Sequence, residues 1–292
     1  MNIRGERECR DCGSRWSYYE TGSVECPDCG SLKSVGTAER ALHTDTHTTL
    51  ELSRHRARFG EARSTLPPEG IDELKRDLRE YVRKRGFVRG GELRRPDSTY
   101  LAARELLEAV DVYDRLRDPT DADREYLLTL LAGADDGERP ESSAVPESMR
   151  EARGMAAART VDEYREDLSA FLDELERRGP ESDEPESDES AIGDSVGNTV
   201  TVDADPTTTD PTTTDPTTTD SIVNPADRVG PARAVLERLR DRTKRVDALH
   251  GDVDPGTADA LIEAADALGD YVRTGNVASL DRARDRIDES ES

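Results

Sequence analysis

The chain has 292 residues, with 65 acidic against 41 basic side chains and a net charge of −24. No run approaches the roughly 18 apolar residues of a membrane span, so we expect a cytoplasmic protein without membrane partners. The basic residues are arginine almost throughout, as in halophiles that accumulate salt, where ions screen charge within about 3 Å at 1 M. We interpret the acidity as an adaptation to the solvent and not as evidence for a cationic ligand.

The four cysteines of the chain form two Cys-x2-Cys-Gly turns in the first thirty residues. In each turn two thiolates converge on one ion, and the glycine permits the positive φ that points backbone N–H groups at sulfur. Four soft thiolates favour one structural Zn²⁺ with no open position for a substrate. Rubredoxin-like iron and disulfide bonds are the alternatives, and the second is disfavoured because no signal peptide is visible. The predicted metal ligands are Cys9, Cys12, Cys26 and Cys29.

The residues around these turns predict a zinc-ribbon hairpin. Residues 15–19 alternate and favour a strand, Thr21-Gly22 turns the chain, and 23–25 lead back, with flanking strands at 7–8 and 32–35. A module this small buries too little apolar surface to fold alone, so metal coordination would supply much of its folding energy.

Three aromatic residues of the hairpin have two interpretations. Trp16, Tyr18 and Tyr19 either cover the metal turn and the hairpin face, or stack on a nucleic-acid base or a partner. We expect the first role to dominate, because a small ribbon has few other apolar side chains.

With these motifs, residues 1–35 resemble the zinc ribbon of the archaeal and eukaryotic transcription factor B family. Within that class, the run from Arg4 to Ser23 is similar to an uncharacterised family of haloarchaeal ribbon-containing proteins. The resemblance covers about an eighth of the chain and implies the ribbon fold and its four ligands. It implies no function, since ribbons serve transcription, translation, RNA modification and scaffolding. No pair of cyclin-like repeats follows, so the chain departs from a basal transcription factor.

Composition divides the chain into five segments. The fourth has no basic and twelve acidic residues and three Pro-Thr-Thr-Thr-Asp units. It lacks the apolar residues to offset ordering entropy, which predicts a disordered, extended spacer. The segments are a zinc ribbon at 1–36, an irregular connector at 37–66, a small helical domain at 67–178, a disordered acidic linker at 179–225 and a C-terminal helical unit at 226–290.

Apolar residues recur at helical spacing in the middle and C-terminal segments. Capping boxes at Thr120 and Thr160 and an Asp254-Pro255 pair mark helix starts. Apolar content is low, so we expect a thin core in the middle domain and a C-terminal hairpin or three-helix unit packed against that domain or a partner. The predicted helices lie at 71–82, 98–116, 120–133, 148–158, 160–175, 231–250 and 254–272, with a short one after Asn276.

One basic stretch interrupts the acidic pattern. Residues 75–95 carry nine basic and three acidic side chains. Nucleic-acid phosphates are a candidate partner, although counterion release weakens such binding at high salt. The alternative, slightly favoured, is pairing within the chain to Glu105, Glu108, Asp111 and Asp114, or to the linker. The candidate contacts are Arg76, Arg79, Arg83, Lys84, Arg89, Arg94 and Arg95.

Catalytic motifs are missing from the sequence. His43-x3-His47 lacks a helix or a carboxylate partner to make it a convincing metal site, and nucleotide-binding and hydrolase motifs are not found. We therefore predict a protein that is not an enzyme and has no small-molecule substrate. It is a nucleic-acid- or transcription-associated factor that docks through its ribbon, or a protein–protein adaptor that uses the ribbon and the C-terminal helices.

Overall fold

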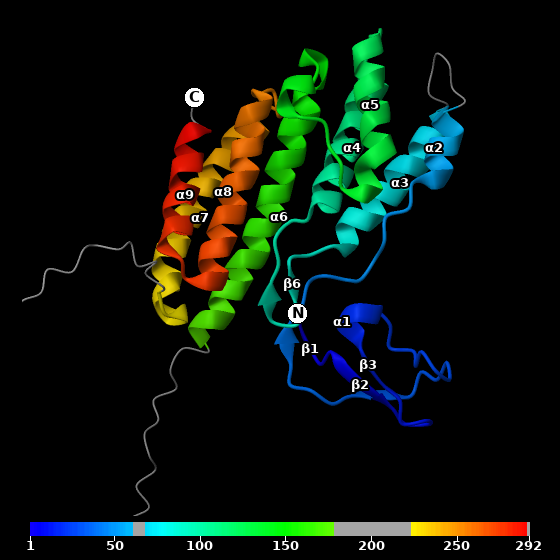
Figure 1. Cartoon of the computed structure of the whole chain (residues 1–292), viewed down its shortest axis with the longest axis vertical. Coiled ribbons are helices and arrows are strands. Elements are labelled where there is room, and N and C mark those ends of the chain that lie inside the picture. Colours follow the sequence, from blue (N-terminus) through cyan, green and yellow to red (C-terminus); the bar gives the residue numbers. More distant parts are fainter. Residues whose placement is uncertain (61–67, 178–222, 291–292) are drawn as a thin grey trace, which may run out of the picture.

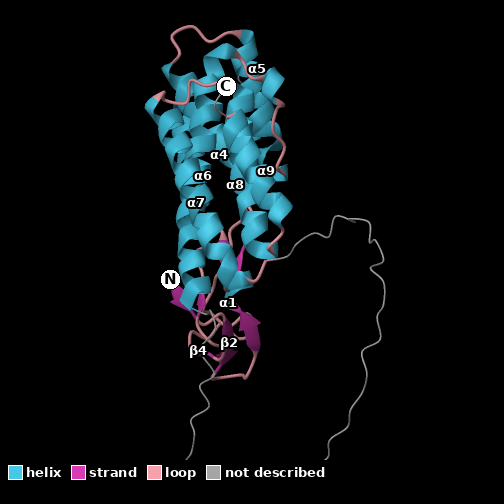
Figure 2. Ribbon diagram, turned by 90° about the vertical axis from the view of Figure 1, so that its left-hand side faces the viewer, coloured by secondary structure: helices cyan, strands magenta, loops and turns pink. Residues whose placement is uncertain are grey.

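The computed structural model of the chain describes residues 1–60, 68–177 and 223–290. A small N-terminal module of short strands lies at one end of a body of long helices (Figure 1). The helices run along the long axis of the molecule (Figure 2). The prediction of a disordered linker at 179–225 falls almost entirely outside the described residues.

The N-terminal module contains a three-stranded antiparallel sheet of order β3-β2-β4. In its central strand, Arg7 lies opposite Trp16 on one side and opposite Gly36 on the other. Strands therefore occur near 7–8 and 32–35, where the sequence predicted them. The strands are β2 (Glu6–Cys9), β3 (Arg15–Ser17) and β4 (Ser34–Gly36).

Of the hairpin predicted between the cysteine turns, the structure contains the first strand, and the prediction is wrong for the rest. Tyr18–Thr21 form the helical turn α1, which ends at Gly22 with a φ of 64°. In the described chain, residues 23–25 form no strand, and β3 pairs with β2. The β propensity of Tyr18 and Tyr19 is overridden by packing, because both rings lie against His43.

Two short strand pairs form the junction between the module and the body. β1 (Asn2–Ile3) pairs with β5 (Ala41–Leu42), and β6 (Val88–Arg89) pairs with β7 (Glu92–Leu93). Gly90 and Gly91 connect β6 to β7 with φ of 61° and 82°, the conformation of a two-residue hairpin turn. The connector predicted as irregular thus contains β5, and it also contains the helix α2 (Ser53–Gly60).

Three helices of the body begin and end close to their predicted limits. Asp97 caps α4 by accepting a hydrogen bond from the Tyr100 N–H at 2.7 Å. Thr120 and Asp123 form the predicted capping box of α5. The helices are α3 (Pro68–Lys84), α4 (Ser98–Arg115) and α5 (Asp121–Gly133).

The fourth helix, α6 (Arg150–Arg177), is one continuous element of 28 residues. The helix start predicted at Thr160 is therefore wrong, and so is the division into two helices. Residues 155–159 are Met-Ala-Ala-Ala-Arg, all strong helix formers, so nothing there ends the preceding helix. Thr160 is only 1% exposed, which places it inside the packed body and not at a helix end.

The C-terminal helices pack directly on the middle helices. Contacts of α6 extend to α4 on one side and to α7 and α8 on the other. A single buried apolar cluster runs from Leu42 to Ile287, so the core is larger than the expected thin core and common to both predicted units. α7 begins six residues before its prediction, with Pro231 inside it. These helices are α7 (Pro225–Ala248), α8 (Pro255–Thr274) and α9 (Val277–Glu289).

A buried ion network also joins the two parts of the body. Glu105 on α4 is fully buried and accepts hydrogen bonds from Arg153 of α6 at 2.9 Å and from Arg139 at 3.0 Å. Arg153 also binds Asp259 of α8 at 2.7 Å. A buried charge is tolerated only when it is paired and hydrogen-bonded, and each of these groups meets that condition.

Candidate metal centre

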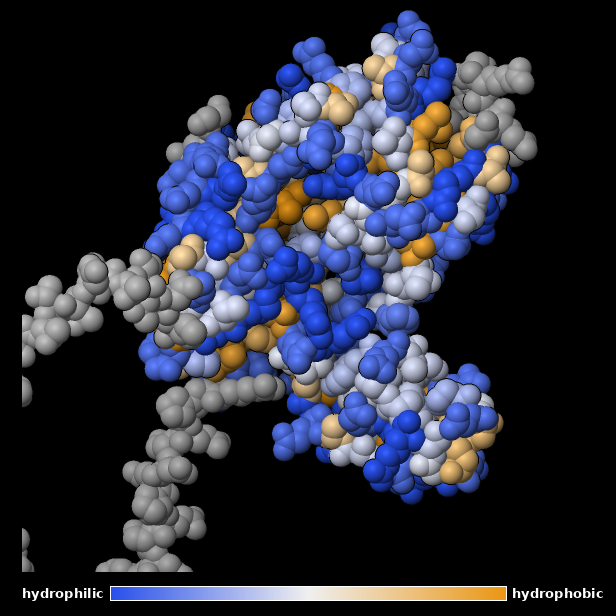
Figure 3. Space-filling model, viewed as in Figure 1, coloured by the Kyte–Doolittle hydropathy of each residue, from blue (hydrophilic) through white to orange (hydrophobic). Residues whose placement is uncertain are grey.

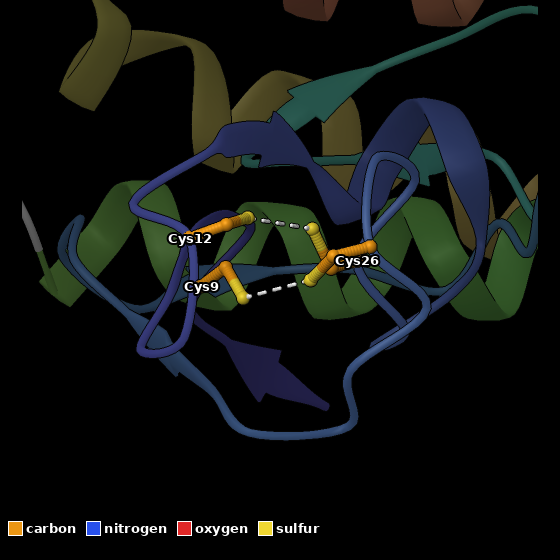
Figure 4. A group of neighbouring side chains, drawn as sticks. Cys9, Cys12 and Cys26 are labelled. Carbon is orange, nitrogen blue, oxygen red and sulfur yellow. Dashed lines mark hydrogen bonds between the residues drawn. The ribbon is translucent and has the colours of Figure 1, made fainter.

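The four cysteines converge at one point of the N-terminal module. All four Sγ atoms lie within 4.8 Å of one another. The Cys9–Cys29 and Cys12–Cys26 sulfur pairs are each 3.6 Å apart, too far for a disulfide (Figure 4). A tetrahedral ion with metal–sulfur bonds of about 2.3 Å requires sulfur–sulfur edges of about 3.8 Å. The cluster therefore has the geometry to bind one metal ion.

The two cysteine turns share one backbone geometry. In the first, the Cys9 N–H donates to Ser14 O at 2.8 Å and the Gly13 N–H donates to Cys9 O at 3.0 Å. Gly13 and Gly30 have φ of 76° and 71°, the left-handed conformation that the sequence predicted for them. In the second turn, the Cys26 and Gly30 N–H groups make the equivalent bonds at 2.9 Å each.

The burial of the cysteines is asymmetric. Cys9 and Cys26 are 2% exposed, whereas Cys12 and Cys29 lie at the surface of the module. A hydrogen bond from the Cys12 backbone N–H lowers the pKa of the Cys9 thiol to about 7. The hydrogen bond from the Ser14 N–H lowers the pKa of the Cys12 thiol in the same turn, but the hydrogen bond of this thiol to Cys26 and its burial outweigh that effect, so the pKa is raised.

A pair of reciprocal hydrogen bonds joins the two turns, and sequence reasoning missed it. Ser14 of the first turn donates to Asp28 of the second at 2.5 Å, and Ser31 of the second donates to Asp11 of the first at 2.6 Å. The signal was present, since both turns read Cys-x-Asp-Cys-Gly-Ser. The repeated Asp and Ser hold the two halves of the metal site against each other.

The three aromatic residues of the module all face inward to some degree. Trp16 is 7% exposed, and its Nε1–H donates to Ser23 O at 3.0 Å, so its ring covers the metal turns and is not available to a partner. Tyr19 packs on His43 with a centroid distance of 4.7 Å and donates its hydroxyl hydrogen to Ile3 O. Tyr18 is half-buried. The candidate stacking surface is therefore reduced to the two half-buried tyrosines.

The predicted basic stretch is largely neutralised within the chain. Asp111 and Asp114 both accept from Lys75, at 2.8 Å and 3.1 Å, as the pairing alternative predicted. Glu105 and Glu108 instead pair outside the stretch, Glu108 with Arg159 at 2.5 Å. Within the described chain, only Arg83 of the nine cations has no ion pair. The other candidates pair as Arg76–Asp77, Arg79–Asp111, Lys84–Glu80, Arg89–Asp45, Arg94–Glu92 and Arg95–Asp270.

Two carboxylates at the junction, Asp45 and Asp167, were not predicted. Asp45 is 3% exposed and binds Arg85 at 2.9 Å and Arg89 at 3.0 Å. Asp167 of α6 accepts from Thr44 Oγ1 at 2.7 Å and from the Phe87 N–H at 2.6 Å, and burial raises the pKa of its carboxyl. No local sequence pattern distinguishes either residue from the many surface carboxylates. Asp45 and Asp167 together join the connector and the segment around β6 to the helical body.

His43 and His55 both lie inside the fold, where they contact neighbouring segments. His43 is buried between the module and the Gly90 turn, whose N–H points at its Nδ1 at 3.4 Å. His55 lies on α2, 2.8 Å from Asp77. Within the described residues, the four cysteines are the group whose ligand atoms are close enough for a metal ion, so His43 and His47 add no second site.

Fold and site together define a mainly helical protein whose N-terminal module brings four cysteines within the distance of a shared metal ion. The chain belongs to a family of unknown function, DUF7117, whose family model matches residues 1–207 and 218–287. Neither the comparison with curated proteins nor that with solved structures gives a match. None of the described helices has the length and apolarity of a membrane span.

Proposed function

We propose that this protein is a zinc-binding, non-enzymatic factor that associates with nucleic acid and docks through its N-terminal module. Four thiolates complete the tetrahedral shell of Zn²⁺, so the ion would hold the module in shape and leave no position for a substrate. Zinc is favoured over iron because it needs no redox partner and is the usual ion of closed sites with four cysteines.

The proposed association with nucleic acid is supported by a difference between two groups of cations, those of the module end and those of residues 75–95, in whether they have a carboxylate partner. In the described chain, Arg4, Arg10 and Arg40 of the module and its connector are exposed and have no carboxylate partner. The basic stretch at 75–95 has only one such cation, Arg83. Free guanidinium groups are the side chains best suited to bidentate phosphate contacts. The docking surface is therefore assigned to the module end and not to α3.

The acidic composition supports a high-salt, cytoplasmic setting for this function. At such ionic strength a surface patch binds phosphate weakly, because counterion release contributes little. Stacking and bidentate contacts depend less on screening, so a site that works there needs an aromatic ring beside its arginines.

Metal analysis and binding measurements on the purified full chain test the proposal. One equivalent of zinc is expected, and fluorescence anisotropy in molar KCl should show binding to labelled DNA or RNA. Cys26→Ser should lose both zinc and binding, while Ser17→Ala, at a hydroxyl that makes no capping hydrogen bond and is no metal ligand, should retain both. Iron in place of zinc would contradict the metal assignment, and the lack of binding to every nucleic acid would contradict the docking role.

A second candidate is a protein–protein adaptor with a purely structural zinc ion. Val24 and Leu32 of the module are 43% and 72% exposed, and apolar side chains of this kind suit a protein partner. The C-terminal helices are weaker candidates for a contact site, because their apolar faces pack on α6. Crosslinked capture of tagged protein from native lysate, with and without nuclease, separates the two. Partners that survive nuclease and are lost in Val24→Ser with Leu32→Ser would favour the adaptor.

A further inference from the structure

A cleft of about 760 Å³ lies where the module meets the connector. Its lining comes from the strands β1, β2 and β4 and from the connector before α2. In Figure 3 the module forms a separate lobe below the helical body. The volume is within the range of about 300–1,000 Å³ that is usual for ligand sites. The lining residues include Ile3, Arg4, Arg7, Tyr18, Val24, Arg40 and His43.

The cleft is cationic in an otherwise acidic protein. Three guanidinium groups line it, from Arg4, Arg7 and Arg40, and no carboxylate of the described chain belongs to the lining. Arg7 is held in place by Ser34, to whose Oγ its Nε–H donates at 3.0 Å. Strand alternation explains the segregation, because Arg7 faces the cleft while its neighbours Glu6 and Glu8 point to the opposite face of β2.

Asp45, the carboxylate that lies between two lining residues of the connector, does not cancel this charge. Asp45 stands between Thr44 and Thr46, which both line the cleft, but it is buried and bound to Arg85 and Arg89. The Asp45 carboxylate is therefore engaged by two arginines and does not belong to the lining. Arg4 and Arg40 have no ion pair within the described chain, so the charge of both is available to a ligand.

The cleft also offers a ring and an apolar wall beside the arginines. Tyr18 is half-buried and Val24 is 43% exposed, both in the lining. His43 is buried behind them, and burial lowers the pKa of its imidazole, so it adds no positive charge at neutral pH. A ring next to free guanidinium groups is the combination that binds a nucleotide unit, with its planar base and its phosphate.

A second polar cavity of the described chain lacks these properties. It has a volume of about 320 Å³ and lies between α3, α4 and α6. Its charges are of both signs and pair with each other, for example Arg115 with Glu151 at 2.7 Å and Arg159 with Glu108 at 2.5 Å. In the part of the chain that the structure describes, each Lys and Arg in its lining has a carboxylate partner, so the cavity attracts an anion less than the cleft does.

We propose that the cleft between module and connector binds a single-stranded nucleic acid, with phosphates on Arg4 and Arg40 and a base against Tyr18. This inference rests on the proposed nucleic-acid function and locates it. A duplex is read by a helix or β-ribbon that projects into its groove, whereas a concave cleft receives an unpaired strand. A free nucleotide offers the same phosphate and base, and the experiment distinguishes it from a strand.

The test measures the fluorescence anisotropy of labelled oligouridine and oligothymidine mixed with the zinc-loaded full chain in molar KCl. Arg4→Ala, Arg40→Ala and Tyr18→Ala should each weaken binding about tenfold, the effect of losing one charge-assisted contact or one stacked base. Arg117→Ala is the matched control. This arginine is exposed, has no ion pair in the described chain and lies beyond the far end of α4, about 27 Å along that helix from Ser98. The control should bind like the parent chain.

A second measurement does not depend on the variants folding normally. An oligonucleotide that contains 4-thiouracil should crosslink to a peptide within residues 1–46, and zinc content with thermal unfolding identifies any variant that is merely unstable. Competition by unlabelled duplex, mononucleotide and inorganic phosphate should be weaker than competition by the strand.

The outcomes separate the two levels of the proposal. If the parent chain binds no nucleic acid, the proposed function fails. If it binds, but Arg4→Ala and Arg40→Ala weaken binding no more than Arg117→Ala, the function stands and the cleft assignment is overturned. If the mononucleotide competes as well as the strand, the assignment to a strand is overturned and the cleft is a nucleotide site. If the duplex competes better than the strand, the proposed preference for an unpaired strand is overturned.

Discussion

In the N-terminal module the buried apolar cluster consists of Cys9, Trp16 and Cys26, whereas in the helical body one cluster extends from Leu42 to Ile287. Two of the three residues in the module's cluster are candidate metal ligands. We therefore expect a bound ion to supply most of the module's stability, as proposed above, whereas the body is stabilised by apolar burial of about 25 cal/mol per Å². The comparison separates a module with a very small apolar cluster from a body with an extensive apolar core.

The largest expected effect is the loss of a metal ligand. Cys26→Ser should remove most of the roughly 10–16 kcal/mol that zinc supplies to small metal-folded modules. We expect zinc loss and proteolytic cleavage within residues 1–40, with helical circular dichroism almost unchanged. Collapse of the helical signal would show that the body also depends on the module.

Next in size is a cavity in the body. Leu168 on α6 is 0% exposed, so Leu168→Ala should lower the free energy of unfolding by about 2–5 kcal/mol. Zinc content should stay the same, because the module has a separate cluster. Leu249, at 49% exposed, provides the control, and its replacement by alanine should change stability by about 0.5 kcal/mol or less. Zinc release from the Leu168 variant before thermal unfolding would contradict this separation.

A smaller effect is expected at the contact between α6 and the turn before α8. A Cβ on Gly154 would overlap the carbonyl oxygen of Gly251, so Gly154→Ala should destabilise the body by about 1–3 kcal/mol. Apart from its chain neighbours, Gly230 of α7 has no atom within 4 Å of an added Cβ, but that Cβ would meet the ring of Pro231, so Gly230→Ala should change stability by less than about 1 kcal/mol. Chemical denaturation measures both, and equal effects would show that the contact of α6 with the turn is loose.

The smallest effect concerns the junction between the two regions. Burial raises the folded-state pKa of Asp167, so the native state holds its proton to higher pH than the unfolded chain. The stability from this group is thus complete below the unfolded pKa and is lost as pH rises through the folded pKa. Asp167→Asn removes the titration, and its stability relative to the parent should improve as pH rises through that window. A constant difference across pH would contradict this.

Much of the local structure followed from the sequence. The cysteine spacing predicted the metal ligands, and helix caps at Thr120, Asp254 and Asn276 predicted where α5, α8 and α9 begin. These features are local, because a cap or a turn is determined by a few neighbouring residues. Failures occurred at Thr160 and Tyr18, where a local signal was overridden by packing against distant residues.

The sequence by itself determined the four-thiolate site, the positions of most helices and the acidic character of the chain. Only the tertiary structure decided that the C-terminal helices complete the same core as the middle helices. The fold likewise decided that most cations of the basic stretch at 75–95 are neutralised by ion pairs. It also decided that Arg4, Arg7 and Arg40 meet beside Tyr18. Charge and periodicity are properties of a segment, but the partner of each charge depends on which segments the fold brings together.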